Sequence, residues 1–94
     1  MSTVIYIDFM QAILAFGDAR ADSYGWVRVQ VADPPDPTTD MYLGREGVII
    51  DAMGDPNSGQ LLYGVLFEIG DEFPTAYFFK KQLKPVPPPN RSIE

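Results

Sequence analysis

The chain contains neither cysteine nor histidine. Without cysteine it has no disulfide framework and no thiolate nucleophile or ligand. Without histidine it lacks the commonest general base and the commonest metal ligand, so Ser-His-Asp and Cys-His mechanisms are excluded within one chain and zinc and copper sites are disfavoured. We therefore expect no catalytic residues, no metal site and no cofactor, and we favour a binding protein over an enzyme.

Positive charge is also scarce. Lys and Arg number 7 against 13 Asp and Glu, which gives a formal net charge of −6 and a pI near 4.3. Because lysine and arginine drive phosphate binding, this balance predicts no binding of nucleic acid and no attraction to an anionic membrane surface. A basic protein is the kind of partner that the charge favours.

Long hydrophobic runs are missing as well. The most apolar stretch, 4–16, is interrupted by Asp8 and Gln11 and is too short to span a bilayer. It has no basic segment in front of it, so it does not resemble a signal peptide. These features predict a cytoplasmic protein.

What remains is typical of a small β domain. The 94 residues are 46% hydrophobic and 13% aromatic, which predicts one folded domain rich in strands. We expect a single domain over 1–86, with a barrel over about 26–86 and a disordered tail over 87–94. Because a chain this short buries a limited core, self-association is a common means of adding stability.

The N-terminal stretch carries helix-boundary signals. Asp8 and Gln11 have the spacing of a capping box, and Gly17 suits the position just after a helix end. A helix over 9–16 would be apolar on nearly every face, so we expect it to be buried all round. The alternative is that this segment forms a strand in the same core.

Strand patterns follow from Trp26 onward. The residues 26–31 alternate apolar and polar, and later apolar runs lie at 48–53, 61–69 and 75–79, with a closing segment at 84–86. Gly64 suggests a bulge or sharp bend, and Lys80–Leu83 a single helical turn whose Leu83 plugs the barrel end. The residues expected to face inward include Val27, Val29, Val31, Ile49, Tyr63, Val65, Phe67, Ile69 and Phe78.

This order of features resembles an SH3-like small barrel. The segments that carry the resemblance are the valine strand, the Pro-rich loop 33–40, Gly47-Val48-Ile49, Tyr63-Gly64-Val65 and the ending Gln82-Leu83-Lys84-Pro85. The resemblance implies a mainly β, five-stranded SH3-like barrel preceded by an apolar helix or strand. Gly47-Val48-Ile49 is similar to KOW-type segments, and the layout is loosely similar to bacterial toxin-immunity proteins and to type II dihydrofolate reductases.

Two sets of residues are candidates for contact with partners. The apolar N-terminal stretch offers a homo-oligomer interface at Phe9, Ile13, Leu14 and Phe16. The aromatics outnumber what one barrel interior can hold, which predicts a ligand or partner surface among Trp26, Tyr42, Tyr63, Tyr77 and Phe79.

Three charged groups are weaker candidates. Asp33, Asp36 and Asp40 carry ligands that Ca²⁺ prefers, but their spacing is not that of an EF-hand. The adjacent Asp71 and Glu72 form a possible acid pair, although neighbours in a turn usually point apart into solvent. A basic patch of Lys80, Lys81, Lys84 and Arg91 could steer an acidic ligand.

Two functions follow. The first is a non-catalytic binding module acting as a homo-oligomer, a dimer or larger, that resembles an acidic immunity protein holding a basic protein partner. The alternative is a small-molecule-binding protein or enzyme with its site at a subunit junction, an expectation that rests on the layout shared with the type II reductases.

Overall fold

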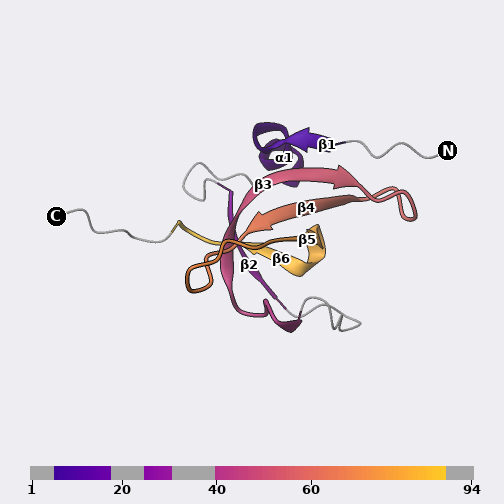
Figure 1. The fold of residues 1–94 in the computed structure, drawn as a ribbon. Coiled ribbons are helices and arrows are strands. Elements are labelled where there is room, and N and C mark those ends of the chain that lie inside the picture. The colour runs from indigo at the N-terminus through magenta and orange to yellow at the C-terminus, as the bar shows by residue number, and fades with distance from the viewer. Residues whose placement is uncertain (1–5, 18–24, 31–39, 89–94) are drawn as a thin grey trace.

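The computed structural model describes residues 6–17, 25–30 and 40–88, which form a mainly β fold (Figure 1). The elements in chain order are β1 (Tyr6–Asp8), α1 (Phe9–Phe16), β2 (Trp26–Val29), β3 (Glu46–Gly54), β4 (Leu61–Leu66), β5 (Thr75–Phe79), the 3-10 turn η1 (Lys80–Gln82) and β6 (Leu83–Pro85). Among the described residues no helix has both the length and the apolar character needed to cross a bilayer. The expected tail from Pro89 onward, and Val31, Asp33, Asp36 and Arg91, lie outside the described residues.

The strands form one antiparallel sheet in the order β5-β4-β3-β2-β6. The long strand β3 uses one edge twice: β2 pairs with its first residues, and β1 pairs with Asp51, Ala52 and Met53 further along. The five-stranded barrel is not confirmed, because the sheet has six strands and is not closed. No ladder joins the outer strands β5 and β6 within the described ranges.

The helix α1 begins and ends at the predicted residues. The Asp8 carboxylate accepts a hydrogen bond from the Gln11 backbone N–H at 3.0 Å, and Gly17 adopts a left-handed conformation with φ of 89°. That conformation favours glycine because it has no Cβ. The short strand β1 precedes the helix directly, so the apolar N-terminal stretch is a strand as well as a helix.

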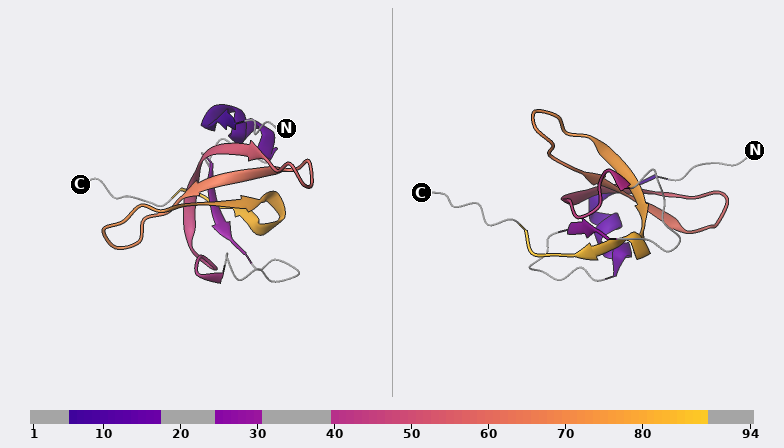
Figure 2. Two further views of the ribbon diagram at one scale, coloured as in Figure 1. Left: turned by 45° about the vertical axis from the view of Figure 1, so that its right-hand side comes forward. Right: turned by 90° about the horizontal axis from the view of Figure 1, so that it is seen from below.

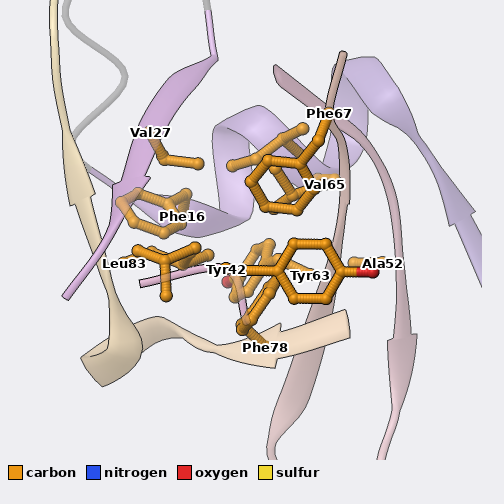
Figure 3. Packing of buried hydrophobic residues seen from close by; sticks show 12 residues of the cluster. Phe16, Val27, Tyr42, Ala52, Tyr63, Val65, Phe67, Phe78 and Leu83 are labelled. Atoms are coloured by element: carbon orange, nitrogen blue, oxygen red, sulfur yellow. The ribbon is translucent and has the colours of Figure 1, made fainter. Parts of the chain in front are cut away.

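The core lies where side chains of the strands and of α1 meet (Figure 3). Val29, Ile49, Val65 and Phe78 are buried as predicted. Aromatic rings fill much of the remaining space: Tyr42 stacks on Phe67 with ring centres 4.7 Å apart. Leu83 is buried after the single turn η1, as the sequence predicted. Further buried residues are Ala12, Phe16, Val27, Ala52, Tyr63 and Val86.

The irregularity expected at Gly64 lies instead on the neighbouring strand. The register between β3 and β4 shifts between Ile49 and Asp51, so the bulge is in β3, opposite Gly64. Gly64 itself makes room for neighbours, because a Cβ there would collide with the Asp51 carboxylate and lie 2.9 Å from the Tyr77 ring. Close approach, and not a bend, is what glycine allows at this position.

The buried Gln82 accepts hydrogen bonds from two backbone N–H groups at the end of the sheet. Its side-chain carbonyl accepts the Phe79 N–H at 2.8 Å, and its backbone carbonyl accepts the Gln30 N–H, also at 2.8 Å. Both bonds tie η1 to the strands beside it. A buried amide with such partners does not carry the penalty of an unpaired polar group.

Candidate functional site

The outer side of α1 is an exposed apolar surface. The helix buries Ala12 and Phe16, four residues apart, against the core, whereas Met10 and Leu14, also four residues apart, are 61% and 67% exposed. The expectation that the helix is buried all round is therefore wrong. A helix lying on the edge of a small fold has only one side for its own core, and nothing in the described chain covers the other.

We define the apolar α1 face as Phe9, Met10 and Leu14, together with Tyr6 on the adjoining strand. All four are exposed, and α1 and β1 lie together at one edge of the molecule (Figures 1 and 2). The helix itself contains no charged residue, although the chain is acidic. Asp8, which caps the helix between Tyr6 and Phe9, is exposed beside this face, so the uncharged part of the face is the helix itself.

Of the four predicted interface residues, the structure exposes two and buries the other two wholly or in part. Phe9 and Leu14 are exposed on the apolar α1 face, as an interface requires. Phe16 is buried, with its ring 5.1 Å from that of Tyr63, and Ile13 is half-buried against the core and Gly25. The sequence analysis missed Met10 and Tyr6. The four-residue spacing of Met10 and Leu14 was a signal that Met10 shares one side of the helix with Leu14.

The five aromatic residues predicted to form a partner surface also differ in their exposure. Tyr42 lies in the core, stacked on Phe67, and so is not a surface residue. Tyr63 is buried except where it lines a pocket. Trp26, Tyr77 and Phe79 are half-buried.

Trp26 lines a groove of about 440 Å³, which we call the Trp26 groove. The register places Trp26 beside Val48, and Val48 beside Leu66, across three strands. Phe73, in the loop between β4 and β5, completes it and was missed because an aromatic in a Gly-Asp-Glu turn gives no strand pattern. Its residues are Trp26, Glu46, Val48, Leu66, Phe67, Glu68 and Phe73.

A second pocket, the lysine pocket, has a volume of about 630 Å³. It brings together Lys80 and Lys81 of the predicted basic patch, whereas Lys84 lies on β6 beside Arg28. The Lys80 ammonium lies 5.3 Å from the centre of the Phe16 ring. The residues of the pocket are Gln30, Gln60, Leu61, Tyr63, Lys80, Lys81 and Leu83.

Two tyrosines have raised pKa values for stated reasons. Burial raises the pKa of Tyr63. Burial also raises the pKa of Tyr77, and the hydrogen bond that its hydroxyl donates to Asp51 Oδ2 at 3.1 Å acts in the same direction. Neither phenol is thereby activated as a base near neutral pH, so these shifts are structural.

The structure describes only some of the acidic candidates. Asp71 and Glu72 are exposed in the loop after β4, and Asp40 is the described member of the predicted cation-binding group. In the described part of the chain, no three acidic residues are arranged so that they could hold a metal ion.

Comparison of the chain with family models, curated proteins and solved structures found no match in any of the three.

Proposed function

We propose that this chain is a non-catalytic binding module of the SH3-like kind that acts as a homo-oligomer assembled through the apolar α1 face. The observation that carries the proposal is the exposure of Met10 and Leu14 on a helix that has no charged residue. Surfaces with contiguous exposed apolar side chains are typical of interaction sites in soluble proteins.

The strand arrangement supports the SH3-like part of the proposal. A sheet in the order β5-β4-β3-β2-β6 has the last strand next to the first strand of the Trp26–Pro85 unit. A single 3-10 turn directly precedes that last strand, and Leu83 after it is buried. These features agree with the resemblance found in the segments from Trp26 to Pro85.

A second copy of the chain is the partner that we assign to this face. Two copies each carrying −6 repel one another, and the repulsion is smallest where the contact itself has no charge. Met10 and Leu14 of the apolar α1 face meet this condition, and the face can pair with itself around a two-fold axis. The helix would then be covered on both sides, as its composition requires.

Crosslinking tests the assembly directly, because the chain has no cysteine of its own. Leu14→Cys and Met10→Cys variants are treated with a short bis-maleimide reagent. Self-association through the α1 face predicts rapid formation of covalent dimers, since residues close to a two-fold axis lie near their own copies. Met41→Cys is the control, because Met41 is similarly exposed and belongs to the turn before β3, not to the apolar α1 face. Equal rates for all three variants would contradict the proposal.

A small-molecule-binding function is the second candidate, and the lysine pocket favours it. Lys80 and Lys81 face a volume of about 630 Å³ with two glutamine amides and the Tyr63 ring, a lining suited to a small carboxylate or phosphate. A thermal shift screen of such anions tests it, because a ligand that binds the native state raises the melting temperature. No shift with wild type, or an equal shift with Lys80→Gln, would count against it.

A further inference from the structure

The Trp26 groove combines an apolar floor with acidic surroundings. Trp26, Val48 and Leu66 form a row across β2, β3 and β4, and Phe73 stands beside it with 62% of its surface exposed. An exposed phenylalanine and a half-buried tryptophan at one groove are the residue types that dominate binding at protein interfaces. The groove is therefore built to receive apolar side chains.

Four carboxylates lie at or near this floor. Glu46 and Glu68 line the groove, and Asp71 and Glu72 lie exposed in the loop that carries Phe73. Arg28 lies beside one of these carboxylates, with its Nη2 2.6 Å from Glu46 Oε2. Because both contacts of Arg28 go to this one oxygen, Glu46 Oε1 is not engaged by Arg28.

The groove is separate from the apolar α1 face. β2 pairs with the first residues of β3, where the groove lies, whereas β1 pairs with the later residues of that strand, and no residue of the apolar α1 face lines the groove. A partner in the groove need not displace a second copy of the chain on the helix.

We propose that the Trp26 groove binds a basic, extended segment of a partner protein, in which arginine or lysine alternates with apolar residues. The inference rests on the proposed function as a binding module and names the surface and the partner chemistry. The apolar side chains of such a segment pack on Trp26 and Phe73. Its cations lie near the glutamates and over the aromatic rings, where a guanidinium gains both charge pairing and contact with a π face.

Trp26 is the single tryptophan of the chain, so its fluorescence reports on this groove without a label. The probe is a synthetic octapeptide of alternating arginine and valine, titrated into wild-type protein. We expect a saturable change in emission that weakens as salt is raised, because charge pairs at a surface are screened. The same peptide with glutamate in place of arginine is expected to produce no change.

Matched variants locate the binding. Phe73→Ser is expected to weaken binding roughly fivefold or more, since it removes an aromatic anchor. Met41→Ser, which removes another exposed apolar side chain outside the groove, is expected to leave the affinity unchanged. Glu46→Gln is expected to weaken binding roughly two- to fivefold. Asp40→Asn makes the same change in net charge outside the groove and is expected to leave the affinity unchanged.

Several outcomes would overturn the inference. One is the absence of a saturable emission change, and another is equal binding of the acidic peptide. A third is an equal loss of affinity in the groove variants and their controls, because that result would indicate attraction to net charge only. The Leu14→Asp variant separates this result from the oligomer proposal, because a monomer that still binds the peptide supports the groove alone. Loss of peptide binding in that variant, with its fold retained, would contradict a groove independent of the α1 face.

Discussion

The Asp51 carboxylate is partly buried between neighbouring strands. Its Oδ2 accepts the Tyr77 hydroxyl at 3.1 Å, and its Oδ1 is buried with no hydrogen-bond donor. The pair lies over Gly64, where any side chain would intrude. The three residues come from β3, β4 and β5, so one hydrogen bond joins the strands beside the bulge.

Removing the Tyr77 hydroxyl should destabilise the protein. Tyr77→Phe keeps the ring but leaves both Asp51 oxygens without a donor, and an unsatisfied buried acceptor costs roughly 1–3 kcal/mol. Chemical denaturation measures the loss. The double variant Tyr77→Phe/Asp51→Ala should recover part of it, because it removes the stranded carboxylate. A double variant less stable than Tyr77→Phe would contradict this account.

The raised pKa of Tyr77 also predicts an alkaline limit to stability. A phenol whose pKa is higher in the folded state than its unfolded value of 10.0 contributes stability that is present below that value and is lost as pH rises through the folded pKa. The free energy of unfolding should therefore begin to fall above pH 10.0. Tyr77→Phe should flatten the decline, with Tyr63 accounting for what remains. An unchanged slope would show that Tyr77 does not contribute.

Gly64 provides a steric test of the same cluster. Gly64→Ala should cost roughly 1–3 kcal/mol, because its methyl group would press on the Asp51 carboxylate and the Tyr77 ring in a packed site. Gly54→Ala is the control, since a Cβ at Gly54 would meet nothing within 4 Å. Equal losses of stability in the two variants would mean that strand propensity, and not contact with Asp51, explains the glycine.

At the scale of elements, the sequence predicts best where one local signal decides the outcome. Asp8 and Gly17 fix the ends of α1 because a cap and a left-handed residue act within a few residues of chain. The 75–79 strand agrees residue for residue with β5, because it lies between Pro74 and the turn at Lys80. The inward residues of β2 and β4 also follow from simple alternation.

The elements that were missed depend on contacts between distant segments. β1 is a strand because β3 offers it an edge, and its three residues carry no pattern of their own. The bulge in β3 cannot be located from the sequence, because Gly64 signals close approach and its partner strand carries the extra residue. The outward orientation of Leu14 likewise depends on which side of α1 the core takes.

The N-cap of α1 gives a prediction at this scale. Asp8→Ala removes the acceptor of the Gln11 N–H and should lower stability by about 1 kcal/mol. Asp8→Asn keeps a capping oxygen and should lose much less. If the two variants were equally stable, the cap would not be what begins the helix. Thermal unfolding of both variants at one protein concentration makes the comparison, because association would otherwise alter the midpoint.

At the scale of the whole molecule, the described chain has one buried core and several surfaces without a cover. The helix completes the core with Ala12 and Phe16 and at the same time exposes Met10 and Leu14. A monomer would leave those side chains in water, whereas a dimer would bury them at about 25 cal/mol for each Å² removed from solvent. In the proposed dimer, the N-terminal helix is therefore both a core element and an assembly element.

A charge placed on the apolar α1 face should disrupt assembly. Leu14→Asp should give a monomer, because association would bury an unpaired carboxylate. Its circular dichroism should match wild type, since Leu14 is not part of the core. Met41→Asp adds the same charge at another exposed position and should assemble normally. Equal effects of the two substitutions would point to net charge, and not to the helix, as the cause.

Sedimentation velocity of the wild-type protein at low micromolar concentration tests the central claim most directly. Self-association through the α1 face predicts a species of at least twice the 10.5 kDa chain mass, with a share of monomer that grows on dilution. A single species of the monomer mass across the whole concentration range would contradict the account, because the exposed side of α1 would then have no second copy to cover it.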